Sequence, residues 1–283
     1  MSDREYATPF PILQAASLLS HKSRIHKFSQ VIERLIQPND IVFDLGTGSG
    51  ILAILAAQQG AQVTAIDANI ESIKYARQAA KANGVLENIK FIHSHFYDFK
   101  PHEKADVILC EMLSSIMLIE QQVPASQYAV NHLLKAEGKI IPQEVKLFVV
   151  PVENEILWNR FLVEELTLPR IPQTAEREQS RDLADLLELE TIDLTAQSSR
   201  PASIDKQLEF EIVQSGTVHG ILGMFESKLY EDITLTMEDG WRELFLPFPE
   251  CINAKVGDRF RIRVTFKPGE YDSLMIETQQ SSQ

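Results

Sequence analysis

The chain has 283 residues, of which 44% are hydrophobic and 24% are charged, as in a soluble globular protein with one large or two ordinary domains. Its formal net charge of −13 argues against a protein that tracks nucleic-acid phosphates, because such proteins usually carry a basic stripe. Cys110 and Cys251 stand far apart and outside any C-x-x-C pattern, which argues against a disulfide scaffold or a zinc site. No export-signal pattern and no apolar stretch of membrane-spanning length is present. We therefore expect a cytoplasmic protein that binds neither nucleic acid nor a membrane.

The first half of the chain alternates predicted helices and strands. Apolar side chains at helical spacing over 17–36 predict one or two amphipathic helices that end before Pro38. The segments that follow are a strand (41–45), a glycine loop (46–50), a helix (51–59), a strand (62–67), a helix (71–85), strands at 89–96 and 105–112, and a helix and strand within 127–142. Strands that alternate with helices form βαβ units, so the sequence predicts a doubly wound, mostly parallel Rossmann-like sheet.

After about residue 145, short segments with alternating apolar side chains predict an antiparallel, β-barrel-like domain. A polar, acidic insertion at 170–207 interrupts this domain and contains one pattern typical of a helix, SRDLADLLELE (180–190). The insertion could be a linker, a lid or a subunit-contact arm. We therefore expect an N-terminal helical segment (1–37), a Rossmann-like domain (38–145) and the antiparallel domain (146–283).

The glycine loop carries the first functional signal. Gly46, Gly48 and Gly50 follow a strand and precede a helix, where glycine allows a sharp turn and a close approach to a ligand. Their G-x-G-x-G spacing differs from the dinucleotide pattern G-x-G-x-x-G and, with Asp44 before it, resembles the class I methyltransferases, which bind S-adenosylmethionine there. Asp67 ends the second strand, where an acid would accept hydrogen bonds from both ribose hydroxyls. A structural turn and an NAD site are the weaker alternatives.

A second signal is CEMLSSIMLIEQ (110–121), which follows the fourth strand at the edge of the sheet where such folds bind ligands. Glu111 and Glu120 stand nine positions apart, and this spacing resembles the double-glutamate loop of the protein arginine methyltransferases. The resemblance covers roughly 12–268 and is weakest across 155–207. It includes LLSHKSRIHKF (18–28), DLGTGSGILAILAAQQGAQVTAID (44–67), TVHGILGMFESKL (217–229) and GWRELFLPFPECINAKVGDRF (240–260). Two carboxylates can hold the planar, charged guanidinium fork and offset the cost of burying it.

The resemblance implies a role for each candidate residue. Glu111 and Glu120 would be catalytic and would grip the substrate, beside Met112, His21 and Trp241. The helical segment 1–37 would cap the cofactor site, and its Arg24 would meet the cofactor carboxylate. The expected cofactor-binding set is Arg24, Asp44, Gly46, Gly48, Gly50, Asp67, Ala68, Phe96, Tyr97 and Glu111, and no metal is expected.

The sequence also departs from the family pattern. The family's Thr-His-Trp reads Asp239-Gly240-Trp241, and the acid that partners the histidine falls at His21. His21 could supply the missing imidazole, the reaction could need no base, the substrate could differ from a protein arginine, or His21 could lie on the surface. Trp241 could pack on a guanidinium or fill the barrel core.

The sequence therefore predicts an S-adenosylmethionine-dependent N-methyltransferase that acts on a guanidino nitrogen of an arginine in a protein, a peptide or a small molecule. The alternatives are a methyltransferase for another amine and a cofactor-binding homologue without activity. Family members commonly form dimers through an arm inserted in the barrel. The stretch 160–205 does not resemble that arm, so a homodimer is the default expectation only.

Overall fold

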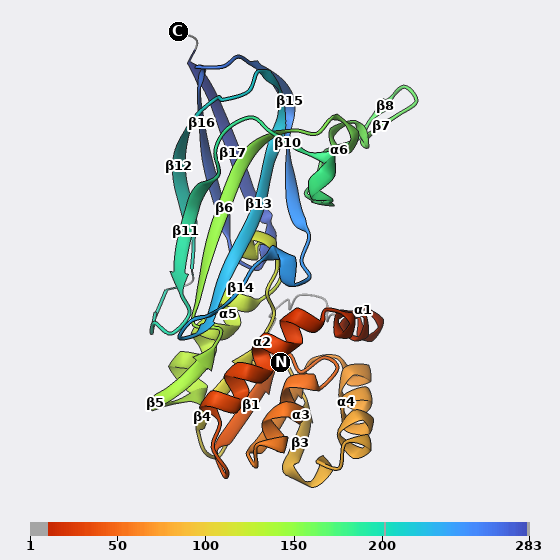
Figure 1. The fold of residues 1–283 in the computed structure, drawn as a ribbon, viewed down its shortest axis with the longest axis vertical. Coiled ribbons are helices and arrows are strands. Elements are labelled where there is room, and N and C mark those ends of the chain that lie inside the picture. The colour runs from red at the N-terminus through yellow and green to blue at the C-terminus, as the bar shows by residue number, and fades with distance from the viewer. Residues whose placement is uncertain (1–10, 201, 282–283) are drawn as a thin grey trace.

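The structure is a computed structural model in which residues 11–200 and 202–281 are described. Figure 1 shows two stacked parts, with helices around a parallel sheet at the bottom and long antiparallel strands at the top. No helix among the described residues is long and apolar enough to cross a membrane.

The lower part is built on a parallel sheet. Its strands are β1 (Ile41–Leu45), β2 (Gln62–Asp67), β3 (Ile89–His93), β4 (Ala105–Cys110) and β5 (Leu134–Ile141), and they lie in the order β3-β2-β1-β4-β5. All neighbouring pairs run parallel. The order reverses between β1 and β4, and the ligand crevice of such sheets lies at the carboxyl ends of the strands at this point. The predicted doubly wound sheet is confirmed.

Helices cover both faces of this sheet because its central strand is apolar on both sides. In β1, Val42 belongs to the core shared with α2 (Lys22–Leu35) and α3 (Ile51–Gln58), whereas Phe43 faces the opposite core, next to α5 (Gln122–Tyr128). Helix α4 (Ile70–Ala82) begins at Asn69, whose side chain accepts a hydrogen bond from the backbone N–H of Glu71. A π-helical turn (Ala129–Leu133) leads from α5 to β5.

The helices predicted over 17–36 are present with a different division. Helix α1 spans Ile12–Ser17, and α2 begins after a short 3₁₀ turn (Leu18–Ser20). Helix α2 buries Phe28, Val31 and Ile32 and ends before Pro38, as the apolar spacing predicts.

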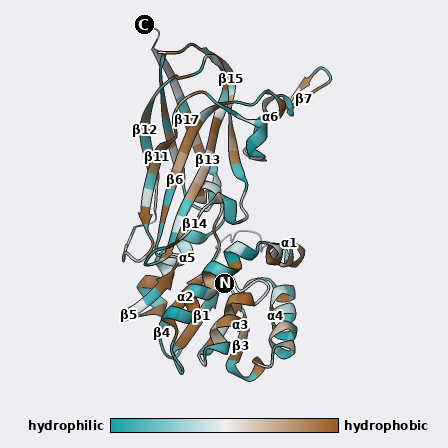
Figure 2. Cartoon of the chain, viewed as in Figure 1, coloured by the Kyte–Doolittle hydropathy of each residue, from teal (hydrophilic) through white to brown (hydrophobic). Residues whose placement is uncertain are grey.

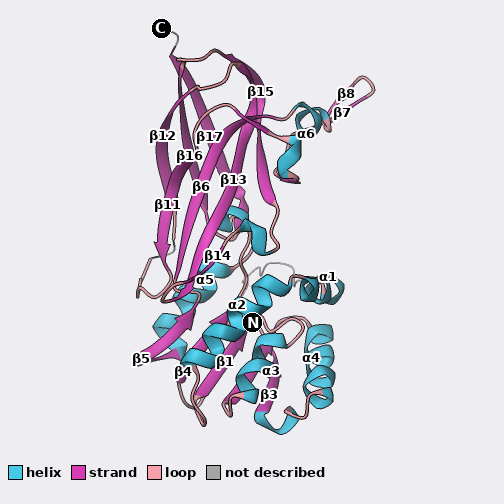
Figure 3. Cartoon of the chain, viewed as in Figure 1, coloured by secondary structure: helices cyan, strands magenta, loops and turns pink. Residues whose placement is uncertain are grey.

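The upper part is antiparallel, which confirms the predicted barrel-like architecture (Figure 3). One sheet runs in the order β10 (Arg181–Asp182), β6 (Glu144–Glu153), β13 (Gly216–Tyr230), β15 (Glu243–Ala254) and β9 (Gln173–Ala175), with β11 (Leu187–Asp193) on β6 and β14 (Ile233–Leu235) on β13. A second sheet contains β12 (Ile204–Glu211), β16 (Arg259–Lys267) and β17 (Glu270–Ser281). Apolar residues recur along β6 and β13, as Figure 2 shows, because these strands face the shared core.

The helix predicted for 180–190 is wrong. Residues 181–182 and 187–193 are strands that pair antiparallel with β6. Leu183 and Leu189 are fully buried, so the apolar side chains that fit a helix period serve a sheet face instead. The insertion 170–207 thus joins the sheet through β9, β10 and β11. The segment that projects from the domain lies earlier, in α6 (Glu155–Asn159) and the hairpin β7 (Leu162–Val163) to β8 (Leu166–Thr167) (Figure 1).

Candidate active site

A cavity of about 1990 Å³ opens between the two parts of the molecule. Its floor includes residues at the carboxyl ends of β1, β2 and β4, among them Gly46, Asp67 and Glu111. The antiparallel domain supplies Trp241 and the turn between β16 and β17. The cavity therefore occupies the crevice that an open α/β sheet provides for ligands.

The glycine loop is shaped by backbone geometry and by Asp44. Gly46 and Gly48 adopt φ values of +73° and +51°, which a residue with a Cβ rarely adopts. Asp44 is 1% exposed, and its carboxylate accepts hydrogen bonds from the Thr47 hydroxyl at 2.6 Å and the Ala53 N–H at 3.2 Å. Burial raises the pKa of Asp44 to about 7, and the two hydrogen bonds act in the opposite direction. Asp44 thus ties the loop to the first turn of α3.

Asp67 shapes the neighbouring wall. One carboxylate oxygen accepts the N–H of Gly48 at 2.8 Å, and the other accepts the N–H of Asn69 at 2.7 Å. Burial raises the pKa of this carboxyl group. A carboxylate has about four lone-pair positions, so Asp67 keeps acceptor capacity for hydroxyl groups of a ligand in the cavity.

Aromatic side chains form a third wall. Phe96 and Tyr97 lie with ring centroids 4.4 Å apart, and Tyr128 meets Tyr97 edge-on at 5.0 Å. The Tyr128 hydroxyl donates to the backbone oxygen of Tyr97 at 3.0 Å, which links α5 to the segment after β3. These rings offer flat apolar surface to a planar base.

The loop with the two glutamates has an unusual backbone. Ile116 and Met117 adopt φ values of +50° and +55°, which are rare for residues other than glycine and are strained for a β-branched residue. Ile116 is fully buried against Gly223 of β13, where an added Cβ would lie 2.6 Å from an Ile116 methyl carbon. Packing against the antiparallel domain therefore holds the loop in this conformation.

Several hydrogen bonds fix the same loop, and two of the residues that form them, Gln121 and Gln122, were not predicted from the sequence. Fully buried Gln122 accepts the N–H of Met112 at 2.8 Å, and Gln121 donates to the backbone oxygen of Gly269 at 2.8 Å. Trp241 donates from Nε1 to the Leu113 oxygen at 2.9 Å. No local pattern indicates these contacts, because most of them join segments that are distant along the chain.

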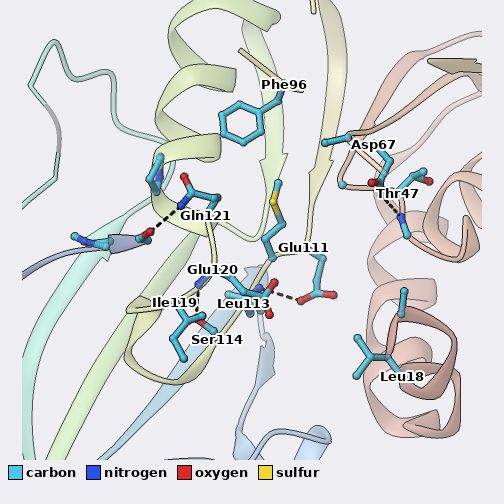
Figure 4. A pocket seen from close by; sticks show the side chains of 18 of the residues that line it. Leu18, Thr47, Asp67, Phe96, Glu111, Leu113, Ser114, Ile119, Glu120 and Gln121 are labelled. Carbon is cyan, nitrogen blue, oxygen red and sulfur yellow. Dashed lines mark hydrogen bonds between the residues drawn. The ribbon is translucent and has the colours of Figure 1, made fainter. Parts of the chain in front are cut away.

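Arg24 lies at the centre of the charged side chains. It is 7% exposed and forms an ion pair with Glu111, while its guanidinium carbon lies 4.3 Å from the ring centroid of Trp241. Burial raises the pKa of Glu120 to about 7, and the positive charge of Arg24 acts in the opposite direction. Burial lowers the pKa of Arg24 to about 10, so the guanidinium stays charged at neutral pH. Figure 4 shows Glu111 and Glu120 on the same loop, with Glu111 directed into the cavity.

The His21 imidazole lies directly against Gly240. A Cβ built on Gly240 would lie 2.4 Å from Cγ and Nδ1 of His21, so the imidazole occupies the space that a side chain at 240 would need. His21 is half-buried and lines the cavity, and the surface-residue interpretation is therefore wrong.

Asp239 connects the segment that contains Gly240 to α2. It accepts hydrogen bonds from Ser23 at 2.5 Å and Lys27 at 2.7 Å. Burial alone would raise the pKa of Asp239, but these donors and the charge of Lys27 hold it below its usual value.

Almost all predicted site residues line this one cavity: His21, Arg24, Asp44, Gly46, Gly48, Asp67, Ala68, Phe96, Tyr97, Glu111, Met112, Glu120 and Trp241. Gly50 does not, and it lies where α3 packs on α4, with its Cβ position 2.7 Å from Ala76 Cβ. Trp241 packs edge-on against Phe225 with ring centroids 5.2 Å apart, and the guanidinium that lies over its ring belongs to Arg24 of the chain itself. In the described part of the chain, no three His, Cys, Asp or Glu side chains are grouped to hold a metal ion.

Comparisons with known proteins agree with this architecture. Residues 28–142 match the family model of the ribosomal protein L11 methyltransferase. An uncharacterized protein of Methanocaldococcus jannaschii is 40% identical over 141 residues, which are 50% of this chain and 54% of that protein. A probable protein arginine N-methyltransferase 6.1 of rice (Oryza sativa subsp. indica) is 34% identical over 40% of this chain and 30% of that protein. Protein arginine N-methyltransferase 7 of Xenopus laevis is 27% identical over 80% of this chain and 38% of that protein.

A solved structure, the Trypanosoma brucei PRMT1 enzyme–prozyme heterotetrameric complex with AdoHcy, superposes with a TM-score of 0.76. The superposition covers 93% of this chain and 95% of the chain in that complex, at 20% sequence identity. In sequence, the chain is similar to protein arginine methyltransferases, and its fold is similar to that of the solved structure. The resemblance seen in its motifs is thereby confirmed for sequence and fold. This arginine methyltransferase-like chain spans about half the length, or less, of the curated relatives named above.

Proposed function

We propose that the chain is an S-adenosylmethionine-dependent methyltransferase that modifies a guanidino nitrogen of an arginine in a protein, a peptide or a small molecule. One observation carries the proposal. Glu111 and Glu120 share a cavity with a glycine loop of methyltransferase type. Carboxylates with limited exposure are costly unless a cation meets them, and a planar fork of N–H donors suits a pair of them.

The cavity suits the proposed cofactor. The backbone of Gly46 and Gly48 gives close access, Asp67 has free acceptor capacity for ribose hydroxyls, and Phe96 and Tyr97 offer a wall for adenine. A volume of about 1990 Å³ exceeds that of a usual single-ligand pocket, so a donor and part of a substrate fit together. When bound, the cofactor would supply a methyl group on a positively charged sulfur.

In this proposal the protein acts mainly by positioning. Glu111 and Glu120 would hold the guanidinium so that one terminal nitrogen faces the methyl group in line with its bond to sulfur. The negative charges would draw positive charge toward the other nitrogens and leave electron density on the attacking one. The nitrogen that accepts the methyl group would then lose one proton to water or to the His21 imidazole.

The two alternatives are a methyltransferase for another amine and a cofactor-binding chain without activity, and a departure from the family pattern favours each. Ser114 and Ser115 replace the aromatic pair of the family loop, and a remodelled pocket would suit another amine. The glycine at 240 removes the family's histidine and would suit a chain that binds the cofactor without turnover.

The finer organisation is also proposed. We propose the same three segments, 1–37, 38–145 and 146–283. The ends of α2 at Leu35 and of β5 at Ile141 support boundaries in these regions, and the first strand of the antiparallel domain, β6, begins at Glu144. A homodimer is supported by exposed apolar side chains on the projecting segment: Ile156, Leu162, Val163, Leu166, Leu168 and Ile171. A cytoplasmic location stays a prediction from the sequence.

The test is incubation of the purified chain with methyl-labelled S-adenosylmethionine and a panel of free arginine, arginine peptides, lysine peptides and simple amines. We expect label on a guanidino nitrogen and none on the lysine peptides. Label on another amine would support the first alternative, and cofactor binding without any transfer would support the second.

A further inference from the structure

The last strand of the chain, β17, forms an open edge of the antiparallel domain. Among the described residues it pairs only with β16, at one end of the three-stranded sheet β12-β16-β17. The strand at the other end of this sheet, β12, lies beside β11. A terminal strand carries backbone N–H and C=O groups that point away from its sheet, and another extended chain can pair with them.

The free edge of β15 is protected, whereas that of β17 is not. Strand β9 covers only the start of β15. Beyond it, Pro247 and Pro249 lack backbone N–H groups. Trp158 donates to the Phe248 oxygen at 3.0 Å, and Arg170 donates to the oxygen of the next residue at 3.2 Å. In contrast, β17 spans 12 residues and contains neither proline nor lysine, the residues that most often protect such edges.

This edge begins at the cavity that contains the two glutamates. Gly269, in the turn before β17, donates to the Met117 oxygen at 3.0 Å, and its own oxygen accepts Gln121 at 2.8 Å. The turn and the first residues of β17, 267–272, line the cavity together with Glu120. A chain that pairs with the start of β17 would therefore pass the loop with the two glutamates.

The charges of β17 favour a basic partner. The strand carries Glu270, Asp272 and Glu277 and no basic residue. Lys267 lies 3.6 Å from Glu270, and Arg263 lies 3.9 Å from Glu277, but these pairs are exposed and contribute little. Acidic side chains along a strand attract the basic side chains of a strand that is added beside it.

We propose that β17 is a docking edge for the substrate, which is an extended, basic segment of polypeptide that joins the sheet as a further strand. Its backbone would pair with β17, and one arginine side chain would reach the two carboxylates. Tyr271, which is 60% exposed and lines the cavity, would contact apolar side chains of the segment. The inference rests on the proposed function and selects a polypeptide over free arginine or a small molecule.

The experiment measures dissociation constants of fluorescent peptides by anisotropy, so the readout does not depend on turnover. A long peptide of about 17 residues carries one central arginine among lysines and β-branched residues, and a short version keeps about two residues on each side of the arginine. We expect the long peptide to bind about tenfold or more tightly, because several backbone hydrogen bonds contribute. Equal affinities of the two peptides would overturn the inference.

A scan in which single backbone N–H groups of the long peptide are methylated tests strand pairing directly. Only every second residue of an added strand directs its N–H toward β17. We therefore expect losses of about twofold to tenfold or more at alternate positions and little change at the positions between them. Similar losses at every position, or no loss at any, would contradict strand addition.

Glu277→Lys tests how far the peptide follows β17, because this residue lies outside the cavity. It should weaken binding of the long peptide about threefold or more and leave the short peptide unchanged. The matched control is Glu211→Lys, which makes the same charge change on β12 at the opposite end of the sheet and should affect neither peptide. Equal effects of the two variants on the long peptide would refute pairing along β17.

These results separate the inference from the proposed function. If labelled methyl groups reach a guanidine while the long peptide has no advantage, only the docking edge fails. If the methylation scan alternates but no label reaches a guanidine in any substrate, the docking edge stands and the proposed function fails.

Discussion

The contact between His21 and Gly240 gives the sharpest prediction, through the substitution Gly240→Ala. The added methyl group would lie 2.4 Å from Cγ and Nδ1 of His21, well inside van der Waals contact. Gly240 also adopts φ +121°, a backbone conformation that alanine rarely adopts. Backbone strain costs about 1–3 kcal/mol and forced repacking about 1–3 kcal/mol, so we expect a loss of about 2–6 kcal/mol.

A matched control separates the two contributions. Gly257 has φ +90° and nothing within 4 Å of its Cβ position, so Gly257→Ala should show the backbone strain alone. The double variant His21→Ala with Gly240→Ala should recover most of the repacking part of about 1–3 kcal/mol. The imidazole is gone, and only the contact with the Cβ of residue 21, at 2.9 Å, remains.

Thermal unfolding followed by circular dichroism measures these differences. A change of 1 kcal/mol shifts the midpoint by about 2–4 °C in a domain of this size range, so Gly240→Ala should melt several degrees below Gly257→Ala. Equal midpoints for the two single variants, or no recovery in the double variant, would refute the proposed packing of His21 into the space at residue 240.

Three further predictions concern the site and the assembly. The kcat/KM of the wild-type chain should rise as the pH passes through about 7, because Glu120 must ionise to hold a cation. Glu120→Gln should lose this pH dependence and about a hundredfold or more in rate, and a variant with the same pH profile as the wild type would exclude Glu120 as the titrating group. Asp67→Ala should weaken S-adenosylhomocysteine binding about tenfold or more in calorimetry, through lost ribose contacts and a freed Gly48 N–H, and an unaltered affinity would contradict the ribose assignment. Leu166→Glu on the exposed hairpin should yield monomers in sedimentation if two copies bury this segment, and an oligomer of unchanged mass would place the interface elsewhere.

Sequence patterns predicted the elements whose signals are local. The glycine loop is recognisable because left-handed backbone at Gly46 and Gly48 requires that residue type. The parallel sheet follows from strands and helices that alternate along the chain. The segment 180–190 shows the limit, since its leucines fit a helix period, and pairing with β6 made it a strand.

The candidate site was predictable in part for the same reason. Glu111 and Glu120 stand at a recognisable spacing, but their conformation depends on Gly223 and Trp241, which lie more than a hundred positions away. For Arg24, the sequence predicted only a contact with the cofactor. No local pattern indicates that its guanidinium lies over the ring of Trp241.

By itself, the sequence determined the order of strands and helices around the parallel sheet, the glycine loop and the presence of two carboxylates after the fourth strand, because each depends on neighbours along the chain. Only the tertiary structure decided that His21 fills the space at Gly240 and that Arg24 lies between Glu111 and Trp241. These contacts join residues from separate parts of the fold. Side-chain packing between such parts follows no repeating pattern along the sequence, so it cannot be predicted from local spacing.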